Sequence, residues 1–400
     1  MSDLIERRRA LLSPSYRLFY DRPVQPVRGE GAWLYEADGT RLLDAYNNVV
    51  PVGHCHPRVV AAMAAQSALL NTHTRYLHQG ILDYSAALLA KFPAALARAT
   101  FTCTGSEAND LAIRVARFVT GGTGIIVTGN AYHGVTGLTA EISPSLGETV
   151  ALGAHVRTVP APAPGVAFGA EVARACADLS RHGIKPALLI VDTVFASDGV
   201  FTDPAGVLAP AAAAIRAAGG LFLADEVQPG FGRLGEAFWG FARHGVVPDL
   251  VSMGKPMGNG YPVAGLVARP ELMAEFGEKI RYFNTFGGNP VAMAAARATL
   301  EVIEAEGLQD NALKMGAALR AELSARTAVR AVRGAGLFLG VALESGALAS
   351  RVVNRMRALG VLISTSGPAG DVLKIRPPLV LSEDQAALLV AAFDKAVADG

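Results

Sequence analysis

The chain has 400 residues, of which 51% are hydrophobic and 18% are charged, and its formal net charge is +1. This composition is typical of a globular protein with a large core, and its length leaves room for two domains. It excludes a disordered chain, and the nearly balanced charge provides no overall field that would attract nucleic acid. No nucleic-acid partner is therefore predicted.

The sequence also argues against a membrane protein, a secreted protein and a metalloprotein. No run approaches 18 uninterrupted apolar residues, and no apolar stretch follows the N-terminal charges. The three cysteines, Cys55, Cys103 and Cys176, are too widely spread for a disulfide framework, which favours a reducing compartment and a cytoplasmic location. His54 and His56 flank Cys55, but no second cluster completes a metal site, so no metal is predicted.

The predicted elements begin with a strand pattern at residues 33–35 and a turn at Asp38 and Gly39. A helical pattern follows at residues 205–218, among four short apolar runs at residues 124–128, 187–191, 221–224 and 250–253. These four runs are continuously hydrophobic rather than alternating, as parallel strands are when helices cover both faces of their sheet. The expected class is therefore α/β.

The remainder of the chain differs in character. Residues 291–306 form an alanine-rich helical pattern, and residues 334–341 have the pattern of a strand interrupted by glycines. We expect a large domain at residues 51–290, with a mainly parallel sheet covered by helices. A smaller α+β domain would combine residues 1–50 and 291–400, from both ends of the chain.

Polar residues occur where the predicted strands and one helix meet. Gly105 and Ser106 precede a helical pattern, and Ser106 is expected to cap that helix. Free amides at a helix start, beside small residues, can bind an anion such as a phosphate. Tyr132 and His133 follow the strand at 124–128, where an aromatic ring can stack on a planar cofactor. The alternative for Ser106 is a simple N-cap with no ligand, and the alternative for Tyr132 is a tyrosine packed in the core.

Asp225 and Lys255 each end a short apolar run, and they are 30 residues apart (255 − 225 = 30). Pyridoxal phosphate needs an amine for its aldehyde and a carboxylate for its ring nitrogen, so this pair predicts that cofactor. Gln228 is placed to hydrogen-bond the phenolic oxygen of the ring. Taken singly, Asp225 can be a turn cap and Lys255 a surface lysine in a loop.

Together these motifs resemble the class III aminotransferases, pyridoxal-phosphate enzymes of fold type I, over nearly the whole chain. The resemblance implies that Lys255 forms the Schiff base and that Asp225 pairs with the pyridine nitrogen. It implies a homodimer with shared active sites, in which Thr285 reaches the phosphate of the neighbouring subunit. The remaining implied cofactor contacts are Gly105 and Ser106 to the phosphate, Tyr132 and His133 beside the ring, and Gln228 to its hydroxyl.

Within that family, the chain looks most like the subgroup that includes ethanolamine-phosphate and phosphohydroxylysine phospho-lyases. The runs that carry this likeness are residues 47–49, 52–57, 71–78 and 255–260. The chain departs from the family where Glu-Pro-x-Gln is usual, since Asp192, Thr193 and Phe195 stand there. It departs again before the Pro-Pro pair near the C-terminus. The candidate substrate residues are Tyr20, Asp192, Phe195, Lys374 and Arg376.

Lys374 stands where many amino-acid transaminases have an arginine for the substrate carboxylate, and lysine is a weaker bidentate partner. The predicted function is transfer of an amino group from a terminal or ω-amine to a keto acid or aldehyde. The alternative is a phospho-lyase that eliminates phosphate and ammonia from phosphoethanolamine or a similar O-phosphorylated amine. A non-enzymatic cofactor- or partner-binding protein is a third reading, which the presence of Lys255 and Asp225 disfavours.

Overall fold

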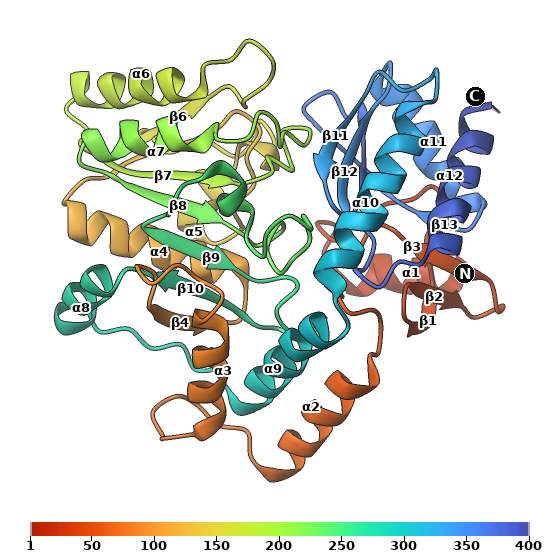
Figure 1. The fold of residues 1–400 in the computed structure, drawn as a ribbon, viewed down its shortest axis with the longest axis horizontal. Helices are drawn as coiled ribbons and strands as arrows, with labels where there is room; N and C mark the ends of the chain where they lie inside the picture. The colour runs from red at the N-terminus through yellow and green to blue at the C-terminus, as the bar shows by residue number, and fades with distance from the viewer. Residues whose placement is uncertain (1, 399–400) are drawn as a thin grey trace.

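The computed structural model describes residues 2–398. Two groups of elements lie side by side, and Figure 1 shows the larger, with a wide central sheet, beside the smaller, which contains both chain ends. This arrangement agrees with the expected fold class. The domain boundaries after residues 50 and 290 stay a prediction.

The larger group is built on a seven-stranded sheet with the order β4-β10-β9-β8-β7-β5-β6. The neighbours from β9 to β6 pair in parallel, whereas β10 is antiparallel to both β4 and β9. The four apolar runs named above are strands of this sheet, as predicted. The strands are β4 (Arg98–Thr102), β5 (Gly124–Thr128), β6 (Val156–Val159), β7 (Pro186–Asp192), β8 (Leu221–Asp225), β9 (Leu250–Met253) and β10 (Ala264–Ala268).

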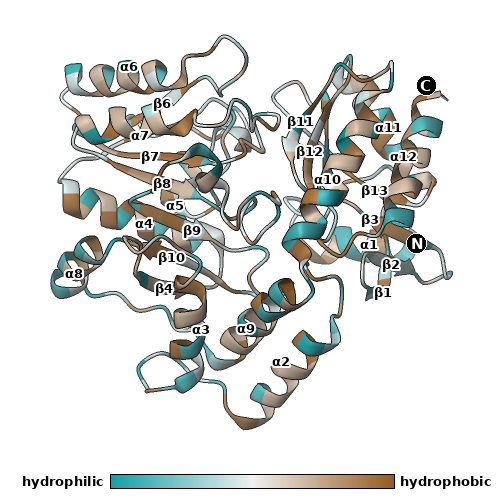
Figure 2. Ribbon diagram, viewed as in Figure 1, coloured by the Kyte–Doolittle hydropathy of each residue, from teal (hydrophilic) through white to brown (hydrophobic). Residues whose placement is uncertain are grey.

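Helices cover both faces of this sheet, so central strands such as β5 and β9 are buried at every position rather than at every second one, and they are mostly hydrophobic (Figure 2). On β7, Leu188 and Ile190 pack in one core cluster with α4, while Leu189 and Val191 pack in another with α6 and α7. The surrounding helices are α4 (Gly105–Thr120), α5 (Gly137–Ala140), α6 (Phe168–Arg181), α7 (Leu208–Ala217), α8 (Pro270–Lys279) and two 3-10 turns, η1 (Pro144–Leu146) and η2 (Gly240–His244).

The smaller group joins the two ends of the chain in one sheet. Strand β13 pairs in parallel with β3, in the order β1-β2-β3-β13, and a second sheet has the order β11-β12-β15-β14. The strands are β1 (Pro26–Glu30), β2 (Trp33–Glu36), β3 (Arg41–Asp44), β11 (Ala331–Ala335), β12 (Phe338–Ala342), β13 (Val361–Leu362), β14 (Ser364–Ser366) and β15 (Val372–Ile375).

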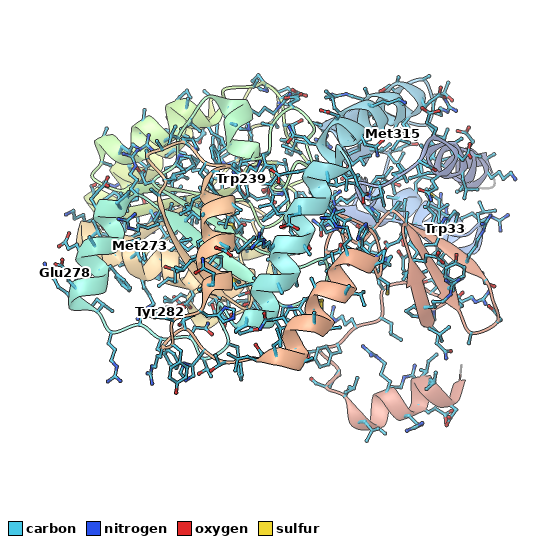
Figure 3. All side chains as sticks on the ribbon, turned by 60° about the horizontal axis from the view of Figure 1, so that its bottom comes forward. Trp33, Trp239, Met273, Glu278, Tyr282 and Met315 are labelled. Carbon is cyan, nitrogen blue, oxygen red and sulfur yellow. The ribbon has the colours of Figure 1, made fainter. Side chains whose placement is uncertain are left out.

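The remaining helices complete the fold. Helices α2 and α3 pack against α9, below the two groups in Figure 1, and α1 projects from the small group in Figure 3. Within residues 2–398, no helix has both the length and the hydrophobicity that crossing a bilayer requires. These helices are α1 (Ser2–Leu11), α2 (Pro57–Leu69), α3 (Gln79–Leu89), α9 (Pro290–Ala305), α10 (Leu308–Ser324), α11 (Gly346–Ala358) and α12 (Glu383–Ala398).

Two local predictions were wrong, and turns explain both. The single strand expected at 334–341 is a hairpin of β11 and β12, because Gly336 at φ +51° reverses the chain inside the run. The helix expected at 205–218 begins only at Leu208, since Gly206 at φ +85° places a turn before it. By contrast, the helix expected at 291–306 is α9 within one residue of each end.

Candidate active site

The carboxyl ends of the central strands meet the start of α4 at one cavity. Asp192 at the end of β7 is the cross-strand partner of Asp225 at the end of β8, and Asp225 is in turn the partner of Ser252 in β9. Lys255 follows β9 directly, so parallel pairing carries these side chains to the same edge of the sheet. The cavity is lined by Gly105, Ser106, Asn109, Tyr132, His133, Gly134, Asp192, Asp225, Val227, Gln228 and Lys255.

The carboxylate of Asp225 is buried and held in one orientation. Its Oδ2 accepts hydrogen bonds from Asn109 Nδ2 at 2.9 Å and from the ring of His133 at 2.7 Å. Its Oδ1 accepts the backbone N–H of Val227 at 3.1 Å. These donors fix the position of the carboxylate, which can serve a positively charged ring nitrogen.

Asn109 is a site residue that the sequence interpretation missed. It lies on the buried face of α4, and its side-chain amide also donates to the carbonyl of His133 at 2.8 Å. One signal was available, since Asn109 is a polar residue on the face that otherwise carries Ala108, Leu111 and Ala112. A polar side chain at such a position needs partners, and here the partners are residues of the cavity.

Lys255 points its amine into the cavity next to Asp225. Burial lowers the pKa of the Lys255 ammonium, although the nearby carboxylate of Asp225 opposes this shift. Among residues 2–398, no side chain forms an ion pair or a hydrogen bond with its Nζ. A lysine in this state yields the neutral amine that imine chemistry requires more readily than an exposed lysine does.

The start of α4 forms the opposite wall of the cavity. The predicted N-cap, Ser106, was wrong: Thr104 caps the helix and forms a capping box with Glu107, because Thr104 has the extended backbone and Ser106 already lies in the first turn. The hydroxyl of Ser106 instead accepts the N–H of Val135 at 3.2 Å. The N–H groups of Gly105 and Ser106 have no acceptor within the helix and are available to an anion.

Close packing requires glycines around this helix start. A Cβ at Gly105 would lie 2.9 Å from a methyl group of Val227, and one at Gly134 would lie 2.5 Å from the hydroxyl of Ser106. Gly134 also has a φ of +140°, which side chains disfavour. The segment that carries Val227 and the segment that carries Gly134 therefore both pack directly against the start of α4. The cavity keeps its width only with glycine at positions 105 and 134.

Tyr132 and His133 follow β5, as the sequence suggested, but they have different surroundings. Tyr132 is partly exposed and lines the cavity, while His133 is buried and binds Asp225. Burial raises the pKa of the Tyr132 phenol, so the ring stays neutral near pH 7. The stacking of Tyr132 on a cofactor stays a prediction.

A hydrogen-bonded chain connects the cavity to the small sheet. Gln228 donates from Nε2 to Asp192 at 3.4 Å, and its Oε1 accepts from the guanidinium of Arg376 at 2.7 Å. Burial, followed by the negative charge of Asp225, raises the pKa of the Asp192 carboxyl to about 6. The predicted candidates Asp192 and Arg376 are thus joined through Gln228.

The structure places the other candidate residues outside this cavity. Phe195 lies in the core, with its ring packed edge-on against Phe168 at 5.5 Å. Tyr20 donates its hydroxyl to the carbonyl of Ile363 at 2.9 Å, close to Arg376. Thr285 is exposed on the loop before α9. Its proposed contact with a neighbouring subunit stays a prediction.

Glu226, next to Asp225, has a structural environment. It is buried and accepts the N–H groups of Gly240 and Phe241 at 2.8 and 2.7 Å, together with the hydroxyl of Thr193. Burial raises the pKa of its carboxyl to about 7. Its carboxylate binds the start of the η2 turn, so Glu226 has a structural role beside the cavity.

The family model for aminotransferase class-III matches residues 19–397 of this chain. The chain belongs to the class III aminotransferase family. Enzymes of this family depend on pyridoxal phosphate, so the predicted enzyme class and cofactor are both confirmed. The resemblance inferred from the motifs is confirmed as well.

Some relatives of this class III aminotransferase are named aminotransferases, and others are named phospho-lyases. An alanine–glyoxylate aminotransferase 2-like protein of Drosophila melanogaster is 37% identical, over 96% of this chain and 85% of that protein. Ethanolamine-phosphate phospho-lyase homolog 1 of Caenorhabditis elegans is 32% identical, over 98% and 92%. A solved phospholyase from Arthrobacter, in complex with phosphoethanolamine, superposes with a TM-score of 0.96 and 41% identity over the whole of both chains.

The residues of the cavity fit the cofactor of the family. One wall offers free amides at a helix start for the phosphate, and the opposite side offers the Lys255 amine and the Asp225 carboxylate. The buried nitrogen Nδ2 of Asn109 and the ring of His133 hold that carboxylate in place. Each group that pyridoxal phosphate requires is thus present in this chain at a single cavity.

Proposed function

We propose that this class III aminotransferase transfers the amino group of a terminal or ω-amine to a keto acid or aldehyde, with Lys255 as the base. The observation that carries this proposal is the amine of Lys255 facing the clamped carboxylate of Asp225 in one cavity. When bound, pyridoxal phosphate supplies an aldehyde for the amine and a ring that accepts electrons from the broken C–H bond.

Each residue of the cavity then has a separate role in the reaction. Lys255 Nζ, whose ammonium pKa is lowered by burial, removes the proton from the carbon that bears the amine and returns it to the carbon on the other side of the nitrogen. Asp225 holds a proton on the ring nitrogen. The amides of Gly105 and Ser106 hold the phosphate, and Tyr132 covers the ring and excludes water.

A phospho-lyase reaction is the second candidate, and a specific observation favours it. Arg376 and Lys374 are cations beside the cavity, and neither forms an ion pair with a carboxylate within residues 2–398. The Arthrobacter phospholyase, solved with phosphoethanolamine, is similar over the whole chain. In this reaction, the electron pair left by proton removal expels phosphate from the adjacent carbon. Water then releases an aldehyde and ammonia.

One experiment separates the two reactions. The holoenzyme is incubated with phosphoethanolamine while free phosphate and acetaldehyde are measured, and amine transfer to pyruvate is followed in a parallel reaction. Amine transfer without phosphate release supports the aminotransferase. Phosphate release without amine transfer would overturn it in favour of the phospho-lyase. Lys255→Ala is the control, since it should abolish either reaction while leaving the protein folded.

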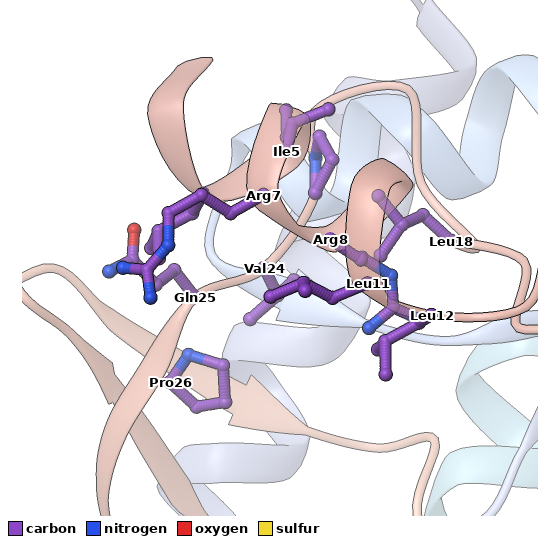
Figure 4. Close-up of a pocket in the computed structure, with 11 residues that line it drawn as sticks. Ile5, Arg7, Arg8, Leu11, Leu12, Leu18, Val24, Gln25 and Pro26 are labelled. Atoms are coloured by element: carbon purple, nitrogen blue, oxygen red, sulfur yellow. The ribbon is translucent and has the colours of Figure 1, made fainter.

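We further propose that the enzyme is a cytoplasmic homodimer with shared active sites. Exposed apolar side chains support a second subunit: Leu4 and Leu11 of α1, and Leu12 directly after it, line a groove formed with residues 18–26. Figure 4 shows Leu11 and Leu12 in this groove. Phe286, next to Thr285, is also exposed. Light scattering after size-exclusion chromatography tests the dimer, and a monomer with full turnover would contradict it.

A further inference from the structure

The chain between α1 and β1 ends in a stretch, residues 17–25, that forms neither helix nor strand, and we call it the connector. Its backbone groups need partners from elsewhere, because a segment outside a sheet has no ladder of hydrogen bonds. A buried ion pair supplies several of these partners. Glu36 ends β2 and Arg357 lies in the last turn of α11, and only 5% and 3% of these two residues are exposed.

The two side chains bind each other and the connector at the same time. Arg357 Nη2 donates to both carboxylate oxygens of Glu36 at 2.9 Å. The guanidinium also donates to the carbonyl oxygens of Arg22 at 3.0 Å and Pro23 at 3.2 Å. Glu36 Oε1 in turn accepts the backbone N–H of Gln25 at 3.1 Å. The pair therefore binds the main chain of the connector through acceptors and through a donor.

Stability alone is a weak reason for a buried ion pair. Two charges lose their hydration when they are buried, and an apolar pair of similar volume often stabilises a fold equally well. An apolar pair could not bind the carbonyl oxygens of Arg22 and Pro23, however, and would leave this part of the connector without fixed partners. The ion pair thus specifies where the connector lies.

The connector carries two aromatic rings to the edge of the active site. The ring of Phe19, which is 51% exposed, stacks on that of Tyr46 with the centroids 5.5 Å apart. Tyr46 lies 5.3 Å from the guanidinium carbon of Arg376, which binds Gln228 in the lining of the cavity. Tyr20, the next connector residue, is close enough to Arg376 for the two groups to interact electrostatically. The position of the connector therefore decides how this wall is covered.

We propose that Glu36 and Arg357 are positioning residues, which hold the connector so that its two aromatic rings cover one wall of the active site. Neither residue lines the cavity itself. Loss of the pair should weaken binding of the amine substrate, because binding would then have to order the connector. Proton transfer by Lys255 should be nearly unchanged. This inference deepens the proposed function and rests on it only for the reaction that is measured.

Amide hydrogen exchange in the holoenzyme tests the position of the connector without turnover. The reporter is the amide of Asp21, which donates to the side chain of Asn354 at 2.9 Å, so none of the substitutions below removes its acceptor. In Glu36→Gln and in Arg357→Met, this amide should exchange about tenfold faster than in the wild type, or more, because the connector opens locally.

Steady-state kinetics test whether the connector serves the active site. The probe is phosphoethanolamine, in whichever of the two candidate reactions the enzyme catalyses. Its KM should rise about three- to tenfold in both single variants, while kcat stays within about twofold of the wild-type value. A pair that acted only on overall stability would move neither quantity in the folded enzyme.

The double variant Glu36→Gln/Arg357→Met separates position from stability. It leaves no unpaired buried charge, so urea denaturation should show it to be more stable than either single variant. The connector carbonyls still lack their donor, so the Asp21 amide should still exchange fast and KM should stay high. This variant also keeps the proposal testable if a single variant does not fold.

Two further variants complete the set. Arg357→Lys keeps the positive charge without the planar fork, so its Asp21 exchange and its KM should fall between those of Arg357→Met and the wild type. Arg326→Met is the matched control. Arg326, just after α10, binds Asp394 of α12 through a similar fork, and its loss should change neither Asp21 exchange nor KM.

Several outcomes would overturn the proposal. These are wild-type exchange of the Asp21 amide in both single variants, a fall in kcat with unchanged KM, and recovery of the wild-type KM in the double variant. A wild-type holoenzyme that turns over no amine would contradict the proposed function instead. Exchange of the Asp21 amide would still decide whether the ion pair holds the connector, so the two failures are distinguishable.

Discussion

Asp192 and Asp225 are cross-strand partners at the carboxyl ends of the parallel strands β7 and β8. Two carboxylates on adjacent strands repel each other. Burial, followed by the negative charge of Asp225, raises the pKa of Asp192 to about 6, although the N–H groups of Val194 and Ala196 oppose this shift. Asp225 accepts three hydrogen bonds, two of them from side chains, and these hold its carboxylate in place.

The first prediction concerns Asp225→Asn. Removing the charge that stabilises a protonated ring nitrogen should lower kcat/KM by roughly 10²-fold or more. It should also lower the pKa of Asp192, because a repelling charge is lost. Kinetics and carboxyl NMR titration measure the two effects separately. Asp310→Asn, an exposed substitution, is the control; an unchanged Asp192 titration would show that the carboxylates do not interact.

Gly105→Ala should weaken cofactor binding. The added methyl would lie 2.9 Å from Val227 and force the start of α4 away from the cavity, at a cost of about 1–3 kcal/mol. Titration of the apoenzyme with pyridoxal phosphate measures the change in Kd. Gly277→Ala is the matched control, because a Cβ at this position of α8 meets nothing within 4 Å and should be neutral or slightly stabilising. Equal Kd values for the two variants would contradict the assignment of the phosphate wall.

Asn109→Ala should reduce both stability and turnover. The buried amide donates to Asp225 and to the carbonyl of His133, and leaving these acceptors without a donor costs about 1–3 kcal/mol of unfolding free energy. Urea denaturation measures the stability, and kcat/KM should fall because Asp225 loses one of its donors. Asn354→Ala, at the surface of α11, should change neither quantity by more than about 0.5 kcal/mol. Wild-type turnover in Asn109→Ala would mean that His133 and the backbone N–H of Val227 suffice to hold Asp225.

Glu226→Gln should change how stability depends on pH. The carboxyl of Glu226 has a folded-state pKa of about 7, above its ordinary value, so its contribution to stability is complete below about pH 4.5. That contribution is lost as the pH rises through 7, on the order of 3 kcal/mol in total. The variant lacks this loss, so the stability of the wild type should fall relative to that of the variant between pH 5 and 8. Urea denaturation across this range measures the difference, and parallel curves would contradict the prediction.

Local sequence patterns were enough to predict the strands of the large sheet, one long helix and the two central residues of the site. The four apolar runs form the parallel strands, because a strand covered on both faces favours apolar residues at nearly every position. Lys255 and Asp225 could be paired from sequence, since parallel strands bring their carboxyl ends to the same edge. The alanine-rich pattern of α9 likewise needed no distant partner to be predicted.

Tertiary structure decided what depends on contacts between distant residues. Asn109 joins the site through a bond to a residue 116 positions away, and Arg376 meets Gln228 across 148 positions. Phe195 stands in the motif that suggested a substrate residue, but its ring packs in the core against Phe168. Patterns of hydrophobicity specify which face of an element is buried. They do not specify which polar groups meet across the interface between two sheets, because those contacts form only when the whole chain has folded.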